Sequence, residues 1–439
     1  MDEFELHIES LAYQGFGIGR TSSGKAVFVP GAAPGDTVRV RSVADKKNYL
    51  ETELIEVIQN GPARVDPNCP YVGLCGGCQW QHIAYSEQLF AKRAAVVSAL
   101  VRIGHIPADT AETIVGECVP SKREMGYRNK LELACGRNEA GRLMLGYHKE
   151  GTTEIVSVDA CPLAHSAIAH TPKAIQGALR YMEGSADLGI FRVGIRHSMR
   201  TKSCEIALWT TPGSFPRSAV AKTLGAAVKV SSIVRVIADA GKTRKIKQVE
   251  VLEGHGFWEE ELGEFDYRIS APSFFQVNTA QAETLQRLVL EGLAVEEGMT
   301  VADLYAGAGT FSLPLADRAG SCMAVESAGS AVRDLRRNAE GAGVWVDVIG
   351  GDSARELPEL GKLDALVVDP PRAGLADGVA ESIAAAGPGR LAYVSCDPAT
   401  LARDIERLQA CGYTLNRVTP VDLFPQTYHV ECVSILVRK

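Results

Sequence analysis

A cysteine stands where a predicted buried strand gives way to a predicted helix, in the segment Tyr-Val-Ser-Cys-Asp-Pro (residues 393–398). Asp397 is suited to cap that helix, and Pro398 to occupy its first position. The amino end of a helix carries partial positive charge, which lowers the pKa of a nearby thiol and favours the nucleophilic thiolate. Cys396 is therefore a candidate nucleophile, and a small buried packing residue is the alternative.

Glu431 is the candidate general base. It lies in the segment Phe-Pro-Gln-Thr-Tyr-His-Val-Glu-Cys (residues 424–432), directly before the last predicted strand. A carboxylate that the sheet brings next to Cys396 could remove a proton during a reaction. A solvent-exposed glutamate at the start of a strand is the alternative.

Four further cysteines have the spacing of metal ligands. Three of them form the pattern C-x5-C-x2-C, and a fourth follows much later; they are Cys69, Cys75, Cys78 and Cys161. Four thiolates suit an iron–sulfur cluster or a structural zinc ion. The chain has 11 cysteines in all and opens with an acidic segment, without the basic and then apolar pattern of a secretion signal. We therefore expect a cytoplasmic protein that uses its cysteines for metal binding or thiol chemistry and not for disulfides.

Three successive strand ends indicate an adenosine-containing cofactor. Residues 301–310 form an apolar strand that runs into a glycine-rich turn and then a helix, and such glycines let a ligand approach the backbone. A second strand ends at Glu326, whose carboxylate can accept hydrogen bonds from ribose hydroxyls, and Asp352 follows a third strand at a typical adenine position. The G-x-G-x-x-G pattern is not met, because Ser312 occupies its third glycine position. An ordinary strand–helix turn is the alternative.

A fourth strand end carries Val-Val-Asp-Pro-Pro-Arg (residues 367–372), in which paired prolines hold the backbone extended. Open α/β sheets bind ligands at the carboxyl edge of their parallel strands. Asp369 is therefore expected to line the same ligand site, and a plain strand-ending turn is the alternative.

These motifs require a doubly wound parallel sheet, and the pattern of short apolar strands and helices from about residue 269 predicts one. Residues 1–60 show closely spaced alternating strands, typical of a small closed or nearly closed β-barrel, and residues 60–63 form the expected linker. Residues 116–268 favour a β-rich unit. A helix is expected from an N-cap at Ser86 to Gly104, with five inward residues: Leu89, Phe90, Val96, Val97 and Leu100.

Composition and charge exclude a fibre or a largely disordered chain. The 439 residues are 46% hydrophobic and 23% charged, which allows two or three globular units. The net charge of −7 is unevenly distributed: residues 20–47 carry six basic and two acidic side chains, whereas residues 290–370 carry six basic and 14 acidic ones. A polyanionic partner is therefore not excluded, because local fields steer such a partner.

On these residues, the sequence resembles the bacterial RNA uracil-5-methyltransferase family, in the branch with an N-terminal TRAM domain and an iron–sulfur cluster. The resemblance covers essentially the whole chain. Its most specific parts are the cysteine group and the segments DLYAGAGTFSLPLA, VDPPRAG, VSCDPATLARD and FPQTYHVE.

The resemblance implies an α/β fold with three parts. A Rossmann-like class I methyltransferase domain would comprise residues 86–115 and 269–439. An OB-like TRAM β-barrel would occupy residues 1–60, and a β-rich central domain with the cysteine cluster would comprise residues 61–85 and 116–268.

The resemblance also implies the roles of individual residues. Cys396 would be the nucleophile and Glu431 the base, and a four-iron four-sulfur cluster would bind to Cys69, Cys75, Cys78 and Cys161. S-adenosylmethionine would contact Gln276, Tyr305, Thr310, Glu326, Asp352 and Asp369. Two positions depart from the family: Gln426 stands where FPHT has histidine, and Asp352 where relatives can carry an amide.

The chemistry explains why a thiol and a carboxylate are needed. Uracil C5 is too weak a nucleophile to attack a methyl sulfonium, so the thiolate would add to C6 and convert the ring to an enolate. After C5 takes the methyl group, the base would remove the C5 proton and the thiol would leave.

RNA is the expected partner, and the target uridine must be unpaired or flipped out to reach the thiol. The TRAM barrel and several basic side chains are candidates for holding the RNA backbone: Lys122, Arg123, Arg128, Lys130 and the cluster at residues 242–247. Each of them is alternatively a solvated surface charge. A monomer is the default expectation, with no membrane association.

Three alternatives stand beside this interpretation. The same chemistry on a transfer RNA T-loop uridine is the first, and the TRAM domain with the cluster favours the ribosomal 23S substrate over it. A non-catalytic RNA-binding protein with an iron–sulfur cluster or zinc is the second, against which the presence of both Cys396 and Glu431 argues. A radical S-adenosylmethionine enzyme is the third. Such enzymes use the spacing C-x3-C-x2-C, whereas this chain has C-x5-C-x2-C, and its four candidate ligands would leave no iron open for the cofactor, so cluster redox catalysis is disfavoured.

Overall fold

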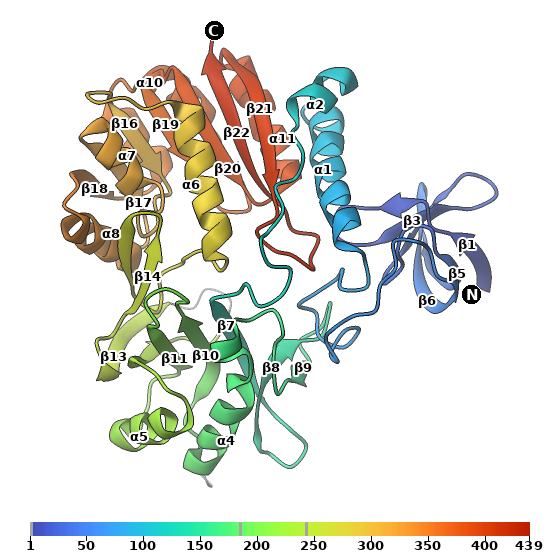
Figure 1. The fold of residues 1–439 in the computed structure, drawn as a ribbon, viewed down its shortest axis with the longest axis horizontal. Helices are drawn as coiled ribbons and strands as arrows, with labels where there is room; N and C mark the ends of the chain where they lie inside the picture. Colours follow the sequence, from blue (N-terminus) through green and yellow to red (C-terminus); the bar gives the residue numbers. More distant parts are fainter. Residues whose placement is uncertain (1–2, 184–186, 242–244) are drawn as a thin grey trace.

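The computed structural model describes residues 3–183, 187–241 and 245–439, which build three large sheets (Figure 1). Of the basic cluster predicted at 242–247, residues 242–244 lie outside the described residues. None of the helices in these ranges is long and apolar enough to cross a membrane.

The N-terminal sheet closes into a barrel. Its strands are β1 (Glu3–His7), β2 (Ser10–Leu11), β3 (Gly17–Arg20), β4 (Ala26–Val29), β5 (Thr37–Asp45) and β6 (Tyr49–Gln59), in the order β1-β5-β6-β4-β3-β2. The outermost strands of the sheet, β1 and β2, are consecutive in the chain, so its two edges lie next to each other. The predicted closed or nearly closed barrel is thus confirmed. Gly19 is required at this crossing, since a Cβ there would lie 2.4 Å from the carbonyl oxygen of His7.

The predicted linker at residues 60–63 is packed against the barrel. The Gly61 N–H donates to Asp36 Oδ1 at 2.8 Å, and Arg64 Nη2 lies 2.6 Å from the other oxygen of this buried carboxylate. A Cβ on Gly61 would lie 2.3 Å from the carbonyl carbon of Gly35. The chain therefore leaves the barrel along a fixed path.

The central sheet has the order β13-β12-β11-β10-β7-β8-β9, and its strands pair antiparallel apart from β11 with β12. They are β7 (Lys130–Arg137), β8 (Leu143–His148), β9 (Ile155–Ser157), β10 (Ile190–His197), β11 (Cys204–Thr210), β12 (Ser232–Ala238) and β13 (Ile246–Gly254). The β-rich prediction holds, but it missed three helices that pack with this sheet: α3 (Ser166–Ala169), α4 (Thr171–Glu183) and α5 (Arg217–Ala227). A hairpin of β14 (Trp258–Leu262) and β15 (Phe265–Ile269) follows.

The C-terminal sheet has the order β18-β17-β16-β19-β20-β22-β21. Its strands are β16 (Val301–Leu304), β17 (Cys322–Glu326), β18 (Val346–Gly350), β19 (Ala365–Val368), β20 (Arg390–Ser395), β21 (Tyr413–Val421) and β22 (Glu431–Arg438). The helices are α6 (Thr279–Leu293), α7 (Ser312–Ala319), α8 (Gly329–Ala342), α9 (Ser353–Glu356), α10 (Val379–Ala386) and α11 (Pro398–Ala410), with a short 3-10 helix at Leu357–Leu360. The first five strands of this order pair in parallel, as predicted.

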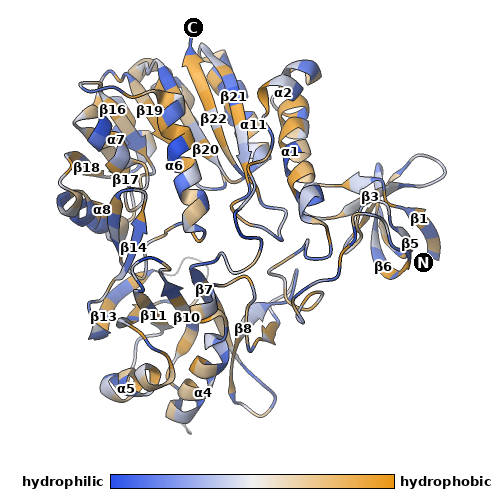
Figure 2. Ribbon diagram, in the orientation of Figure 1, coloured by the Kyte–Doolittle hydropathy of each residue, from blue (hydrophilic) through white to orange (hydrophobic). Residues whose placement is uncertain are grey.

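The last strand corrects the expectation of a parallel sheet. β22, whose ribbon is mostly hydrophobic in Figure 2, pairs antiparallel with both β20 and β21. Residues 422–430 connect β21 to β22, and so short a connection cannot form the helical crossover that parallel neighbours need. As a result, β22 begins at the sheet edge where the parallel strands end.

The predicted helix at 86–104 is α1 (Tyr85–Arg102), and it is followed by α2 (Ala108–Ile114). The N-cap of α1 is Ala84, which makes no side-chain capping hydrogen bond, so the expected cap at Ser86 is wrong. Val96, Val97 and Leu100 are buried as predicted, whereas Phe90 is 64% exposed. α1 packs against α11, so a segment that precedes the central sheet in sequence covers the C-terminal one.

Candidate active site and cysteine pocket

The strand order brings the predicted site residues to one edge of the C-terminal sheet. Tyr305, Asp369 and Cys396 directly follow β16, β19 and β20, and these strands are parallel neighbours. Glu431 is the first residue of the antiparallel β22, in which Cys432 pairs with Ser395, so it starts at the same edge. The sheet therefore joins Cys396 to Glu431 as the sequence predicted.

The glycine-rich turn after β16 has the backbone shape that the sequence suggested. Gly309 has φ 100°, and a Cβ there would lie 2.5 Å from a side-chain carbon of Leu313. Tyr305 also has positive φ, 63°, a conformation that residues with a Cβ rarely adopt. The Glu326 carboxylate accepts hydrogen bonds from the N–H groups of Gly307 at 2.8 Å and Ala328 at 2.6 Å. Glu326 is thus fixed beside the turn, with lone pairs left for ligand hydroxyls.

Three other predicted cofactor residues lie around this turn. The Thr310 carbonyl accepts a hydrogen bond from Gln286, and the Asp352 carboxylate caps α9 through the Ala354 N–H at 3.1 Å. The buried Gln276 lies just before α6, and its carbonyl accepts a hydrogen bond from Asn129 of the central part. The two halves of the molecule thus meet beside the site.

Cys396 lies in acidic surroundings. Asp397 caps α11 through the N–H groups of Ala399 and Thr400, and Pro398 opens the helix, as predicted. Burial and the nearby carboxylates, first Glu431 and then Asp369, raise the pKa of the Cys396 thiol to about 12. The expectation that the helix terminus lowers this pKa is therefore wrong, because burial and negative neighbours outweigh the terminus. At neutral pH, the resting Cys396 is a thiol.

Glu431 and Asp369 form a buried carboxyl pair. Glu431 is 4% exposed, so the alternative of a solvent-exposed strand-start residue is wrong. Burial raises the pKa of Asp369 to about 7, and burial together with Asp369 raises the pKa of Glu431 well above its usual value. Two carboxyl groups so close do not both ionise readily, so the pair retains a proton near neutral pH.

The N-terminal barrel contributes a side chain that sequence reasoning missed. The Tyr13 hydroxyl, in the loop between β2 and β3, donates to Asp397 Oδ2 at 3.4 Å, next to Cys396. Arg372 Nε lies 3.4 Å from the same oxygen, and the ring of Tyr428 meets that of Tyr13 edge-on at 5.6 Å. The sequence predicted a barrel over residues 1–60, but nothing in it signals that this loop docks beside the thiol.

Gln426 has a structural role at this site. Its Oε1 accepts a hydrogen bond from the Gln88 amide at 3.1 Å, and its backbone N–H donates to Gln88 Oε1 at 3.0 Å. The loop before Glu431 is thereby tied to α1.

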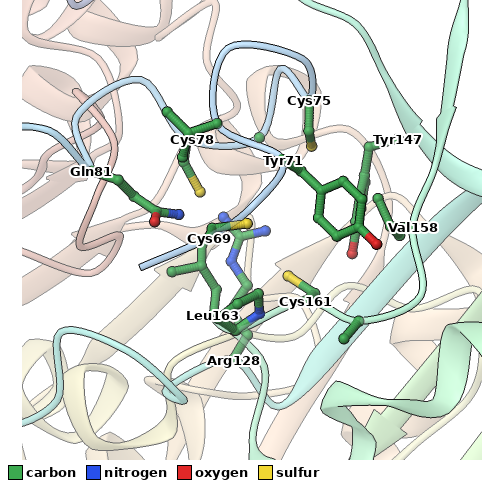
Figure 3. Close-up of a pocket in the computed structure, with 14 residues that line it drawn as sticks. Cys69, Tyr71, Cys75, Cys78, Gln81, Arg128, Tyr147, Val158, Cys161 and Leu163 are labelled. Carbon is green, nitrogen blue, oxygen red and sulfur yellow. The ribbon is translucent and has the colours of Figure 1, made fainter. Parts of the chain in front are cut away.

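The four metal-spaced cysteines line one pocket (Figure 3). Cys69, Cys75 and Cys78 come from one loop, and Cys161 approaches from the segment after β9. Burial raises the pKa of all three loop thiols, that of Cys78 to about 11. Gly76 packs tightly in this loop, since a Cβ there would lie 3.0 Å from the backbone of Glu150.

The donor set of this pocket fits a soft metal centre. Within the described residues, no three ligating side chains are close enough to surround a single metal ion. The four thiols nevertheless converge on one cavity of about 60 Å³, beside Arg128 and Tyr147. Thiolates spread around a cavity suit a polynuclear iron–sulfur centre better than one zinc ion, which requires a tight tetrahedron.

Comparison with protein families agrees with this architecture. Residues 2–55 match the TRAM domain, residues 285–393 the methyltransferase small domain, and residues 353–439 the tRNA (uracil-5-)-methyltransferase family. The predicted TRAM barrel and methyltransferase fold are thereby confirmed.

Known relatives match nearly the whole chain. An uncharacterized RNA methyltransferase of Gloeobacter violaceus is 38% identical, over 98% of this chain and 95% of the relative; another, of Thermosynechococcus vestitus, is 35% identical, over 98% and 97%. Among solved structures, the Pyrococcus abyssi tRNA (uracil-54, C5)-methyltransferase in complex with S-adenosyl-L-homocysteine has a TM-score of 0.77 and 27% identity, and the match covers 99% of both chains.

Proposed function

Because this chain belongs to the RNA (uracil-5-)-methyltransferase family, we propose that it methylates C5 of a uridine in 23S ribosomal RNA, with S-adenosylmethionine as methyl donor. The observation that carries the proposal is the meeting of Cys396 and Glu431 at one sheet edge, beside Asp369. A thiol and a carboxylate are the two groups that this reaction needs.

Cys396 is the proposed nucleophile. Its sulfur bonds to uracil C6, and the electrons of the C5–C6 double bond move into the ring as an enolate. Since its pKa is about 12, the thiol must lose its proton as it attacks, and the ionised member of the Asp369–Glu431 pair can accept that proton. The pair then holds two protons, so Glu431 must release its proton to solvent before it can act as a base at C5.

The bound methyl donor supplies an electrophilic methyl group on a sulfonium, which the enolate carbon C5 takes. Glu431 then removes the C5 proton, the C5–C6 double bond re-forms, and the C6–sulfur bond breaks to release Cys396 as thiolate. The thiolate regains a proton, so the net change is replacement of the C5 hydrogen by methyl and release of one proton. A buried carboxylate with a raised pKa is well suited to this proton transfer.

The methyl donor is proposed to bind along the carboxyl edge of the sheet. Glu326 would bind the ribose and Asp352 the adenine, with further contacts from Gln276, Tyr305, Thr310 and Asp369. The support for this is the glycine turn, with its close backbone approach, and the fixed carboxylate of Glu326.

We propose a four-iron four-sulfur cluster on Cys69, Cys75, Cys78 and Cys161. Four protein ligands leave no iron position open, so its role would be to hold the loop and position RNA, not to carry out redox chemistry.

The proposed division of the chain follows the sheets: a TRAM domain at residues 1–60, a central domain at 61–85 and 116–268, and a methyltransferase domain at 86–115 and 269–439. Because its proposed substrate is made in the cytoplasm, we propose that the enzyme works there, as a monomer.

A transfer RNA T-loop uridine is the second candidate substrate. The likeness to the Pyrococcus abyssi tRNA (uracil-54, C5)-methyltransferase favours it, whereas the TRAM domain together with the cysteine group favours ribosomal RNA.

The test is transfer of labelled methyl from S-adenosylmethionine to unmodified 23S ribosomal RNA and transfer RNA, with anaerobically purified protein. We expect 5-methyluridine in digested ribosomal RNA with the wild type and none with Cys396→Ala. Label in transfer RNA alone would show that the substrate is transfer RNA and not ribosomal RNA. RNA binding without methyl transfer by either protein would favour the non-catalytic RNA-binding alternative.

A further inference from the structure

A groove on the central sheet lies apart from the two sites described above. It has a volume of about 390 Å³ and is bounded by the turn between β10 and β11, by α3, and by the loop between α5 and β12. None of the described residues that line it is acidic, and two of them, Lys202 and Lys229, are lysines from separate loops. A groove with this charge favours an anion.

The two lysines keep N–H groups for a ligand, although one N–H of Lys202 donates to the carbonyl oxygen of Met199. Both are exposed, and neither has a carboxylate partner among the described residues. Lys202 has φ 63°, which a residue with a Cβ rarely adopts.

His197 lines the groove and stacks on His165, which lies outside the lining. The rings of His197 and His165 are nearly parallel, 6° apart, with centroids 5.0 Å from each other. His197 is only 8% exposed, and its Nδ1 lacks a hydrogen-bond partner within the described part of the chain. Burial, then His165 and Lys202, lower the pKa of His197, and burial, then Arg123 and Lys202, lower that of His165. The charges that act on this pair are therefore positive, and an anion would relieve them.

One loop links this groove to the proposed active site. Arg123, which acts on His165, lies two residues after Ser121, whose hydroxyl accepts a hydrogen bond from the Asn278 amide at 3.2 Å. Asn278 caps α6 and follows the proposed cofactor residue Gln276 by two positions. A strand of RNA leaving the catalytic edge could follow this loop to the lysines.

We propose that the groove binds a backbone phosphate of the RNA that flanks the target uridine, with Lys202 and Lys229 as its cationic contacts. The proposal rests on RNA being the substrate. A flipped-out base needs its neighbouring phosphates held, and such contacts position RNA without reading its sequence. The groove therefore sets affinity and register, and the chemistry stays with Cys396.

The test compares Lys202→Asn/Lys229→Gln with a matched double variant, Lys362→Gln/Lys439→Gln. Asparagine tolerates the left-handed backbone at position 202. Lys362 precedes β19 and Lys439 follows β22, so both lie at the sheet edge opposite Cys396. The control substitutions therefore remove the same net charge as the groove substitutions, but far from the proposed site. Binding of a fluorescent 23S fragment is measured by anisotropy from about 50 to 300 mM salt, alongside methyl transfer.

We expect the groove variant to bind about tenfold more weakly and to lose about 1 to 1.5 from the slope of log Kd against log salt. KM for RNA should rise while kcat at saturating RNA stays unchanged, and Lys202→Arg/Lys229→Arg should keep the wild-type slope. Equal slopes in the groove variant and the wild type, or equal losses in both double variants, would overturn the proposal. Because binding is measured separately, a failure of methyl transfer in the wild type would count against the proposed function alone.

Discussion

The two thiol sites of this protein differ in their charged neighbours. Carboxyl groups outweigh the nearby cation Arg372 around Cys396, and Glu431 and Asp369 raise its pKa. The groups acting on Cys69, Cys75 and Cys78 are other cysteines, Gln81, backbone N–H groups and Arg128, with no carboxylate among those described. Negative neighbours hold a thiol protonated until a substrate arrives, whereas a cationic neighbour helps a cavity accept several thiolates. The surroundings thus distinguish the proposed nucleophile from the proposed metal ligands, although burial raises the pKa in both places.

The largest expected effect comes from Cys396→Ala. Without the sulfur, no C6 adduct forms, and methyl transfer should fall by at least about 10⁴-fold, while RNA binding is retained. Cys432→Ala, one strand position beyond Glu431, is the matched control and should keep most of the activity. Substantial turnover by Cys396→Ala would show that the reaction proceeds without this thiol.

Glu431→Gln separates the two halves of the reaction. The amide cannot accept the C5 proton, so turnover should drop by about 10²- to 10⁴-fold. Because Asp369 can still accept the thiol proton, addition to C6 should proceed in this variant, and methylated RNA should remain bound to Cys396 and migrate with the protein on a denaturing gel. A variant that is slow but leaves no covalent species would assign Glu431 to an earlier step.

The pH dependence of alkylation at Cys396 tests whether its carboxyl neighbours set the pKa of the thiol. A thiol with a pKa near 12 is protonated across the neutral range, and its thiolate fraction increases about tenfold per pH unit up to that value. The iodoacetamide rate at Cys396, followed by peptide mass spectrometry, should therefore still be rising between pH 9 and 9.5. An unperturbed thiol levels off as pH passes about 8.5. Such a plateau at Cys396 would mean that its acidic neighbours do not control it.

The site was predictable from sequence where it depends on strand ends, and not where it depends on contacts between distant segments. The strand-end rule explains the position of Cys396, because a parallel sheet collects its carboxyl ends at one edge whatever the sequence separation. Glu431 reaches the same edge at the start of β22, because that strand runs antiparallel, which the sequence pattern did not predict. The pKa of Cys396 was predicted in the wrong direction, since it depends on carboxyl groups from two other strands and not on its own helix. Tyr13 was missed because its contact spans 384 positions and depends on how the barrel docks.

In the fold, too, local sequence patterns were predictive, whereas features set by chain connections and packing were not. Alternation and apolar strands predicted the barrel and the parallel strands, but the direction of β22 depends on the short connection that precedes it. Phe90 has the spacing of an inward residue and yet is exposed, because the start and rotation of α1 are set by packing on α11 and not by a cap at Ser86.

Loss of the cysteine pocket should affect stability more than chemistry. Cys78→Ser should abolish bound iron and the visible absorbance of anaerobic protein, because a thiolate ligand is lost. The melting temperature should fall by several degrees, whereas kcat of the folded protein should change by less than about tenfold. Cys135→Ser, in β7 and outside the pocket, should retain iron. A loss of turnover as large as that of Cys396→Ala would make the pocket part of the chemistry.

The smallest expected effect tests whether the barrel reaches into the reactive site. Tyr13→Phe removes one hydroxyl that donates to Asp397 at 3.4 Å, a long hydrogen bond and therefore a weak one. We expect kcat to fall about two- to fivefold, because Asp397 and the start of α11 lose one restraint, with no change in Kd for RNA. Tyr49→Phe, whose ring packs on Phe28 inside the barrel region, is the matched control and should leave both values unchanged. If Tyr13→Phe instead weakened RNA binding at constant kcat, the barrel would act on RNA alone, and the control of Cys396 would belong entirely to the C-terminal sheet.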